Sequence, residues 1–348
     1  MPAAGRTIAV FRALQLGDML CAVPALQALR AGEPDAHITL IGLPWARSFA
    51  ARYSALVDDF MPFPGAPGMP EQDADAGGLE RFFADARARR FDLAIQLHGS
   101  GTITNPIVRQ LGARRMAGFC SGAPTPAPGE CLIPWPDGNE IERLLALMHA
   151  LDYPRTDPHL SFPLLPEDLR DWRRLADTHA LQPGGYVCVH PGARMLSRRW
   201  PVERFAEVAR GLAGPWRIVV TGAADEAALA RRLCQLAGVP VVNLCGQTSL
   251  GAMAALIAHA RLLICNDTGA SHIAAAMNTP SVVVSCGSDS ERWAPLDRTL
   301  HTVLADYPPC RPCAWQACPY GHECALNIEV DRVAAVARCL AETEREHG

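Results

Sequence analysis

The sequence contains no lysine, since all 32 of its basic residues are arginine. Its 36 acidic residues give a formal net charge of −4, which argues against a dedicated nucleic-acid-binding protein. Every cationic contact to a ligand must therefore come from a guanidinium. That group binds phosphate through two N–H groups at once, but it does not act as a general acid or form a Schiff base.

Long apolar runs are also missing. No stretch of about 18 uninterrupted apolar residues occurs, which argues against a transmembrane helix. The first 18 residues carry an acid and turn-forming residues where a signal peptide needs a clean apolar core and a cleavage site. We therefore expect a cytoplasmic protein, with at most peripheral contact at the inner face of the inner membrane.

A third absence concerns glycine. The loop after the first expected strand, residues 13–17, lacks the Gly-x-Gly-x-x-Gly pattern of dinucleotide-binding proteins, which disfavours a dinucleotide-dependent oxidoreductase.

Short apolar strands alternate with helical patterns along the chain, which is typical of parallel α/β sheets. We expect strands at residues 8–11, 37–42, 92–97, 186–189, 217–221, 241–244, 262–265 and 281–285. Residues 64–78 and 121–138 are rich in Pro, Gly and Ala and are expected to be loops. Prolines at 158, 163 and 166 indicate a linker, so the 348 residues should form two Rossmann-like domains.

The clearest local motif covers residues 266–272, between an apolar strand and an alanine-rich helix. Backbone N–H groups at a helix N-terminus, with the helix dipole behind them, favour an anion such as a diphosphate. Gly269 permits a close backbone approach, and Thr268 and Ser271 can cap or donate. The alternative is a simple strand-to-helix turn capped by Asp267 and Thr268.

Three further polar groups follow expected strands: an arginine pair at residues 198–199, a carboxylate at Glu226 and another at Asp18. Each has a structural alternative, either as a solvated helix entry or as an acid at a helix start. Open α/β sheets bind ligands at the C-terminal ends of their strands, and all these groups fall there. Together they predict a site for anionic and hydroxyl-bearing ligands.

In order along nearly the whole chain, these motifs resemble glycosyltransferase family 9, the ADP-heptose:lipopolysaccharide heptosyltransferase family. The residues that carry the resemblance are Gly17-Asp18 with Pro24-Ala25-Leu26, His190-Pro191-Gly192 with Arg198-Arg199-Trp200-Pro201, and Asp267-Thr268-Gly269 with Ser271-His272. The resemblance implies a GT-B fold, with two Rossmann-like domains facing a central cleft. It also implies an inverting transfer of heptose from ADP-heptose to a lipopolysaccharide core or other surface glycan.

The resemblance implies a role for each matching residue. Asp18 matches the catalytic base, and Arg12 and Asn139 fall where the acceptor would bind. Relatives often have His at the position of Asn139, and well-studied members have Lys at the position of Arg198. The residues expected to bind the donor are Gly17, His190, Gly192, Arg198, Glu226, Asp267, Thr268, Gly269 and His272.

The resemblance also predicts how the chain divides. Residues 1–163 would bind the acceptor, a glycan or glycolipid, and residues 164–328 the nucleotide sugar. Residues 329–348 would form a helix that packs back on the N-terminal domain. No cofactor is required, because arginine and a helix N-terminus neutralise the diphosphate in place of a metal ion.

Four of the 13 cysteines are closely spaced near the C-terminus, at Cys310, Cys313, Cys318 and Cys324. Four thiolates over such a span can enclose a structural Zn or Fe ion. Reduced thiols and disulfides are the two alternatives. A similar segment occurs in many family members and is missing from others, so it is not expected to be catalytic.

Other functions stay open on the sequence alone. A protein acceptor of the autotransporter type would keep the donor chemistry and change the acceptor. A GT-B nucleotide-sugar 2-epimerase would use the same fold on a single substrate. A non-catalytic sugar-binding module would lack the base function predicted for Asp18.

Overall fold

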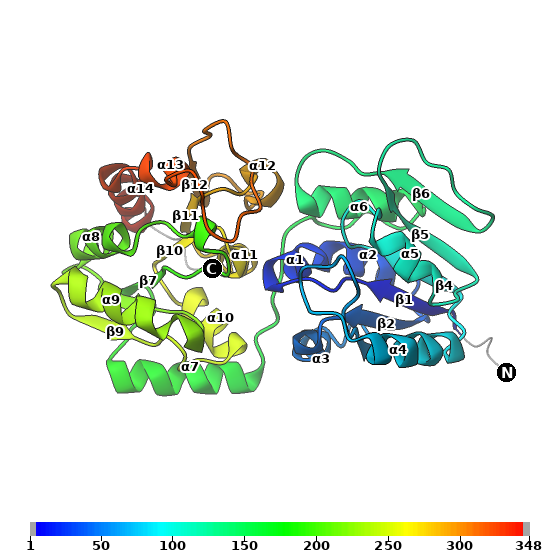
Figure 1. The fold of residues 1–348 in the computed structure, drawn as a ribbon. Helices are drawn as coiled ribbons and strands as arrows, with labels where there is room; N and C mark the ends of the chain where they lie inside the picture. The colour runs from blue at the N-terminus through cyan, green and yellow to red at the C-terminus, as the bar shows by residue number, and fades with distance from the viewer. Residues whose placement is uncertain (1–4, 344–348) are drawn as a thin grey trace. The chain divides into compact units, whose positions relative to one another are not determined.

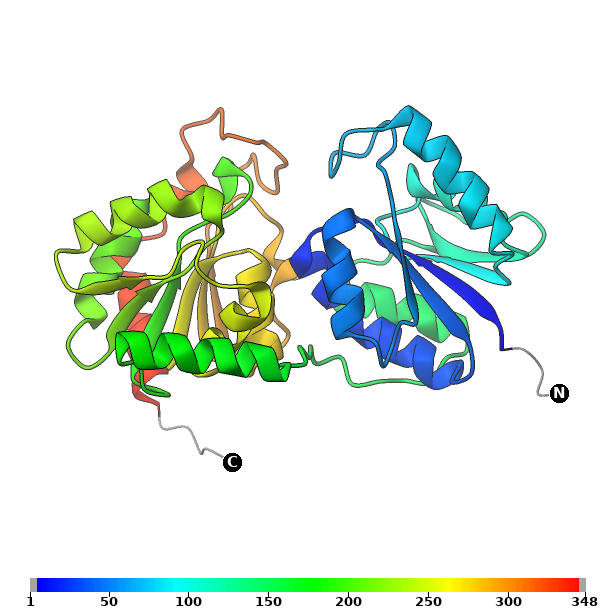
Figure 2. The ribbon, with the colours of Figure 1, turned by 90° about the horizontal axis from the view of Figure 1, so that it is seen from below.

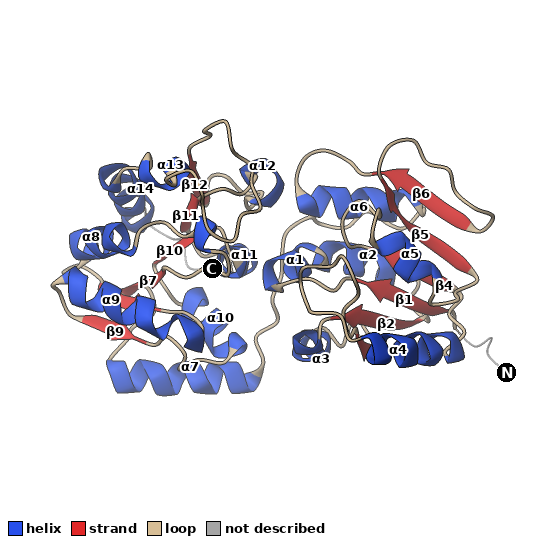
Figure 3. Ribbon diagram, in the orientation of Figure 1, coloured by secondary structure: helices blue, strands red, loops and turns tan. Residues whose placement is uncertain are grey.

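The computed structural model describes residues 5–343, which form two compact units divided after Pro158. The division falls a few residues before the boundary predicted at residue 163. Helix α7 (Pro166–His179) begins shortly after it, with a proline in its first turn. Each unit contains a parallel sheet between helices (Figures 1 and 3).

The first unit contains a six-stranded parallel sheet in the order β3-β2-β1-β4-β5-β6. Its strands are β1 (Thr7–Phe11), β2 (His37–Gly42), β3 (Asp59–Pro62), β4 (Leu93–Gln96), β5 (Arg115–Cys120) and β6 (Glu130–Pro134). The central strand β1 pairs in register with β2 on one side and with β4 on the other. Four of its five residues are buried, as expected for a strand covered on both faces.

The helices of this unit are α1 (Leu16–Cys21), α2 (Val23–Gly32), α3 (Arg47–Arg52), α4 (Ala76–Ala88), α5 (Thr104–Arg109) and α6 (Glu140–Ala150), with a 3-10 turn η1 (Pro44–Ala46). Apolar residues of α4 and α5 pack with Phe11, Phe63 and Met116 in one core cluster. Helix α2 packs against α6 (Figure 1).

The second unit contains a six-stranded parallel sheet in the order β12-β11-β10-β7-β8-β9. Its strands are β7 (Tyr186–His190), β8 (Arg217–Val220), β9 (Val241–Asn243), β10 (Leu262–Asn266), β11 (Ser281–Ser285) and β12 (His301–Ala305). Its other elements are α7, η2 (Leu196–Arg198), α8 (Val202–Leu212), η3 (Ala224–Glu226), α9 (Ala227–Ala237), α10 (Leu250–Ala258), α11 (Gly269–Ala276), α12 (Ser290–Trp293), α13 (Glu323–Leu326) and α14 (Val330–Glu342).

Alternate residues of the β7 strand face opposite sides of this second sheet. Val187 and Val189 join a core with residues of α8, α9 and α14. Tyr186 points the other way, and its hydroxyl donates to the Leu256 carbonyl of α10 at 2.6 Å. Helix α10 in turn packs beside α7 (Figures 1 and 2). The sheet therefore lies between two helical layers.

Counted within each unit, both sheets have the same strand order, 3-2-1-4-5-6. In such a sheet the connections leave the first and fourth strands in opposite directions, which opens a crevice at their C-terminal ends. That point lies between β1 and β4 in the first unit and between β7 and β10 in the second. These two places are where ligand-binding residues are expected.

The eight strands expected from the sequence are all present, but four more were missed. Strands β3, β5, β6 and β12 complete the two sheets. The expected loop at residues 121–138 is wrong in part because it contains β6. This edge strand is only half-buried, and glycines and prolines flank it, so its sequence lacks the apolar run of a central strand.

The C-terminal helix also differs from expectation. Val333, Ala337 and Ala341 of α14 are buried in the core of the second unit. The helix packs against α8, β10 and β11 there. Its apolar face is therefore used within the second unit, whereas the resemblance predicted packing on the N-terminal domain.

Candidate functional site

The crevice of the second unit is organised by Asn266, the last residue of β10, which is fully buried. Its amide nitrogen donates to the carbonyls of Pro191 (2.7 Å) and Gly192 (3.2 Å). Its amide oxygen accepts the Trp200 N–H at 2.8 Å. One side chain therefore joins the loops after β7 and β10. Asn266 is the first residue of the predicted motif at residues 266–272, but this joining role was not predicted, because an asparagine side chain carries no chemistry of its own.

The predicted anion-binding turn, residues 266–269, leads into α11. Thr268 is the N-cap residue, but its side chain makes no capping hydrogen bond and its hydroxyl reaches back to the Asn266 carbonyl at 3.5 Å. The Ser271 hydroxyl also turns back, to the Thr268 carbonyl at 2.7 Å. Neither hydroxyl caps the first-turn N–H groups. The Ser271 N–H donates to the Thr268 carbonyl at 3.0 Å, and the N–H groups of Gly269 and Ala270 are the candidates for binding an anion. His272 lies within α11 and is buried.

A second part of the crevice combines His190, Gly192 and Glu226. The Glu226 carboxylate lies 3.9 Å from His190 Nε2 and accepts the Ala223 N–H at 2.9 Å. A Cβ on Gly192 would lie 1.9 Å from a Glu226 carboxylate oxygen, so any other residue would force this carboxylate to move from its present position. The His190 Nδ1 meets the Thr221 hydroxyl at 3.0 Å, and burial lowers the pKa of the ring.

Arg198, in η2, is half-buried beside this crevice. Its Nη2 donates to the Cys313 carbonyl at 2.6 Å and its Nη1 to the Cys286 carbonyl at 3.4 Å. Burial lowers its pKa, while the nearby Cys313 and Asp267 act in the opposite direction. Both hydrogen bonds go to neutral carbonyls, so neither of them neutralises the positive charge of the guanidinium.

Asp267 is held by hydrogen bonds to residues in β11 and in the loop that follows it. One of its carboxylate oxygens accepts the Ser288 hydroxyl at 2.5 Å, and its own N–H donates to the Val284 carbonyl at 3.2 Å. Ser288 was not among the residues predicted from the sequence. It lies outside every recognised motif, and only the parallel pairing of β10 with β11 brings it beside Asp267.

In the first unit, the predicted base Asp18 lies in the first turn of α1, where it is half-buried. Its Oδ2 accepts the Gln15 N–H at 3.2 Å, so the carboxylate does cap the start of this helix. The Asp18 backbone carbonyl accepts a bond from Arg12 Nε at 2.8 Å. Gly17 occupies the preceding position of the same turn. The turn is thereby fixed at the C-terminal end of β1.

The two residues expected to contact the acceptor make internal bonds in the structure. Arg12 is fully buried, and its Nη2 lies 3.1 Å from Glu140, which is also fully buried. Asn139 is the buried N-cap of α6, with its Oδ1 accepting the Ile141 N–H at 3.0 Å. Both side chains thus have internal partners, and contact with the acceptor by either residue stays a prediction.

His98 is a further polar residue at the crevice of the first unit, just after β4. Its Nδ1 accepts the Ala13 N–H at 3.3 Å, which leaves the hydrogen of the neutral ring on Nε2. That nitrogen lies 3.8 Å from a Glu71 carboxylate oxygen. The ring also stacks on Phe11. A lone histidine after a short strand gave no signal that could have selected it from the sequence.

The predicted metal site at the four clustered cysteines does not fit the structure. Within residues 5–343, no group of three or more His, Cys, Asp or Glu side chains is arranged to hold a metal ion. Cys310 is exposed and Cys324 is buried, while the Cys313 N–H donates to the Gly287 carbonyl at 2.8 Å. The segment is tied to its surroundings by such backbone bonds. All 13 cysteines are free thiols.

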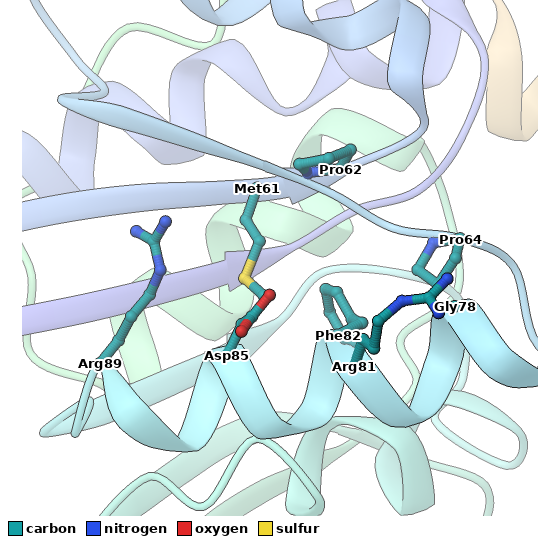
Figure 4. Close-up of a pocket in the computed structure, with 8 residues that line it drawn as sticks. All are labelled: Met61, Pro62, Pro64, Gly78, Arg81, Phe82, Asp85 and Arg89. Atoms are coloured by element: carbon teal, nitrogen blue, oxygen red, sulfur yellow. The ribbon is translucent and has the colours of Figure 1, made fainter.

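A separate surface pocket of about 360 Å³ lies between β3 and α4 in the first unit (Figure 4). Met61 and Phe82 contribute apolar lining, and Arg81, Asp85 and Arg89 contribute charged lining. None of the predicted site residues lines it. Arg89 is already paired with Asp59, so we assign this pocket no role.

Asp73-Ala74-Asp75 is the chain's one Asp-x-Asp triplet, a sequence often considered for metal-bound nucleotide sugars. Here Asp75 is the N-cap of α4, and its side chain accepts the Gly78 N–H at 2.9 Å. The triplet therefore begins a helix.

In the part of the chain that the structure describes, no helix has the length and apolar character needed to cross a membrane.

Similar proteins identify the family. The model of glycosyltransferase family 9 (heptosyltransferase) matches residues 80–323. Lipopolysaccharide heptosyltransferase 3 of Escherichia coli is 28% identical over 310 residues, which cover 82% of this chain and 84% of that protein.

Two solved structures share the fold. A family 9 glycosyltransferase from Veillonella parvula aligns over 98% of both chains with a TM-score of 0.79 and 20% identity. The E. coli ADP-heptose lipopolysaccharide heptosyltransferase II aligns over 97% of this chain and 98% of its own, with a TM-score of 0.70 and 21% identity. These likenesses confirm the predicted GT-B fold. The chain belongs to glycosyltransferase family 9, the heptosyltransferase family, and is a glycosyltransferase.

Proposed function

We propose that this enzyme transfers a heptose from ADP-heptose to a hydroxyl of a lipopolysaccharide core or another surface glycan, with inversion at the anomeric carbon. The observation that carries the proposal is the crevice of the second unit, in a chain that belongs to family 9. There Arg198, Glu226 and the first turn of α11 surround the ends of β7, β8 and β10. Its relatives in E. coli are named for heptose transfer to lipopolysaccharide, which supports the choice of sugar and acceptor.

In the proposed reaction, Asp18 removes the proton from the acceptor hydroxyl as its oxygen attacks the anomeric carbon. The bond from that carbon to the diphosphate oxygen breaks, and ADP leaves with the electron pair. Arg198 and the N–H groups at residues 269–270 stabilise the charge that develops on the leaving diphosphate. Arginine and the helix N-terminus suffice for this role, so we propose that transfer requires no divalent metal ion.

The remaining donor residues would bind the nucleoside. Glu226 is proposed to accept hydrogen bonds from the ribose hydroxyls, as a carboxylate with only one oxygen committed to a backbone N–H. Burial lowers the pKa of His190, so its ring is neutral at neutral pH and adds no positive charge beside Glu226. Gly192 and Gly222 keep the space around this carboxylate open.

We assign the acceptor to residues 1–163 and the donor to residues 164–328. The acceptor would be a glycan or a glycolipid, and the enzyme would work in the cytoplasm, where it would meet a membrane only peripherally. Fractionation of cells that express the chain tests this, since recovery from the periplasm would contradict it.

The donor can be tested by thermal melting with a panel of nucleotide sugars. A ligand present at 100 times its Kd stabilises the folded state by about 2.7 kcal/mol, so ADP-heptose should raise the melting temperature measurably. Stabilisation by a UDP- or GDP-sugar, with none by ADP-heptose, would overturn the donor assignment.

Transfer itself is tested by measuring ADP release with and without a truncated lipopolysaccharide acceptor. A transferase releases ADP when the acceptor is added. Conversion of the sugar without an acceptor would favour a nucleotide-sugar epimerase. The absence of any turnover, with the donor bound, would favour a binding module.

A further inference from the structure

Arg311 lies in the cysteine-rich segment, residues 310–324, and is only 8% exposed. Its Nε donates to the Ser288 carbonyl at 2.8 Å and its Nη1 to the Asp306 carbonyl at 2.6 Å. Its Nη2 donates to the Ser285 hydroxyl at 2.8 Å. Because all three guanidinium nitrogens are bonded, the side chain is held in one position.

From Arg311 a chain of hydrogen bonds leads to the predicted diphosphate turn. The hydroxyls of Ser285 and Ser288 are 2.8 Å apart, and Ser288 Oγ lies 2.5 Å from Asp267 Oδ2. A guanidinium only donates and a carboxylate only accepts. The direction is therefore fixed: Ser285 donates to Ser288, and Ser288 donates to Asp267.

We propose that Arg311 is a positioning residue for the nucleoside diphosphate, acting on Asp267 through these two serines. The inference rests on the proposed donor site. The same segment also holds Arg198, since the Cys313 carbonyl accepts its Nη2 at 2.6 Å. The cysteine-rich segment thus orients both Asp267 and Arg198 beside the turn. It does so through hydrogen bonds and not through its thiols.

A physical reason for such positioning comes from the place of Asp267 in the chain. It immediately precedes Thr268, the N-cap of α11. A carboxylate there is attracted to the first-turn N–H groups of the helix, which are the groups proposed to bind the diphosphate. The Ser288 bond holds one carboxylate oxygen toward the neighbouring strand. Loss of the bond would let Asp267 compete with the ligand and repel it.

The experiment compares Ser285→Ala with Ser281→Ala, a matched control. Both serines belong to β11, both are fully buried, and each substitution removes one hydroxyl. Ser281 lies at the opposite end of the strand, where its hydroxyl is 2.8 Å from His301 Nδ1. Calorimetry with ADP should show about tenfold weaker binding for Ser285→Ala and wild-type affinity for Ser281→Ala. The KM for the donor should rise with kcat little changed.

Two further comparisons separate positioning from stability. Ser285→Ala combined with Ser288→Ala should bind ADP no more weakly than Ser288→Ala alone, because Ser285 acts on Asp267 only through Ser288. Arg311→Lys, which can still donate to Ser285, should bind ADP better than Arg311→Met. Melting temperatures of Ser285→Ala and Ser281→Ala should be similar.

Equal ADP affinity in Ser285→Ala and Ser281→Ala would overturn the inference. So would losses that add in the Ser285→Ala and Ser288→Ala double variant, or equal affinity in the two Arg311 variants. If the wild-type chain binds no ADP at all, it is the proposed donor site that fails. The wild-type measurement therefore distinguishes the two failures.

Discussion

The two units share one strand order but use the polar residues at their crevices differently. In the first unit, the Arg12 guanidinium is enclosed and paired with Glu140. In the second, Arg198 is half-buried, and among residues 5–343 its hydrogen bonds go to two neutral carbonyls. Asn139 caps a helix with its side chain, whereas the Thr268 hydroxyl does not.

The comparison shows that the position of a polar residue at a crevice does not by itself give that residue a ligand-binding function. The shared topology places the crevice at the ends of the first and fourth strands of each sheet. Whether a polar residue there binds a ligand depends on whether other groups of the protein already form hydrogen bonds or ion pairs with its side chain. In the first unit, changes at most crevice residues should cost stability, while in the second they should cost donor binding. The following tests bear on that contrast.

The largest effect is expected for Asp18→Asn, the exception in the first unit. A general base contributes about 10²- to 10⁴-fold to a rate, so turnover should fall to a similar extent. Asparagine can still accept the Gln15 N–H, and ADP affinity and melting temperature should change little. Turnover with a lipopolysaccharide acceptor measures the effect. Undiminished transfer would contradict the base assignment.

Glu140→Ala should act on stability. It leaves the fully buried Arg12 without its carboxylate partner, which typically costs about 3–5 kcal/mol. Denaturant unfolding measures this loss. Glu142→Ala, an exposed acid on the same helix, serves as the control and should be nearly neutral. Similar stabilities for the two variants would remove the structural role assigned to the buried pair.

Arg198→Ala should act on the donor. Removal of one charged group that stabilises the developing diphosphate charge should lower kcat/KM by about 10²-fold, with little change in the free energy of unfolding. Arg198→Lys keeps the charge and should recover part of the activity. A loss confined to stability, with kcat/KM unchanged in the folded fraction, would assign Arg198 to packing.

His301, at the start of β12, should make stability depend on pH. Burial lowers its pKa to about 4, with Asp297 acting against the shift and His272 adding to it. The unfolded chain, with a pKa near 6.5, then binds the proton that the folded chain excludes, so stability falls as the pH drops from about 6.5 toward 4. Between pH 7 and pH 5 the loss should be about 2 kcal/mol.

Urea unfolding of the wild type and of His301→Gln at these two pH values checks this. The variant should be less stable at pH 7, because the bond to Ser281 changes, but it should lose less on acidification. An identical pH dependence in both proteins would assign the acid sensitivity to other groups.

The smallest effect is expected for chelation. No three candidate ligands are grouped for a metal ion among residues 5–343, and the proposed diphosphate site relies on Arg198 and a helix N-terminus. EDTA should therefore leave turnover and melting temperature unchanged. A loss of either that added Zn²⁺ or Fe²⁺ restores would return the four clustered cysteines to a metal-binding role.

The prediction of two Rossmann-like domains succeeded because buried parallel strands are continuous apolar runs between helices. The eight strongest of these runs were identified from the sequence. Strand β6 was missed because one edge of a sheet needs less burial and tolerates nearby glycine and proline. The destination of α14 was also not encoded locally, since an amphipathic pattern predicts an apolar face but not the surface that covers it.

The sequence by itself determined the chemical types available to the site: guanidinium as the only strong cation, carboxylates at Asp18 and Glu226, and a helix N-terminus after Asp267. Tertiary structure alone decided which of these groups are already satisfied. It pairs Arg12 with Glu140, and it joins Arg311 to Asp267 across two strands through Ser285 and Ser288. The physical reason is that a hydrogen bond between residues far apart in the chain depends on strand order and register, and no local pattern records them.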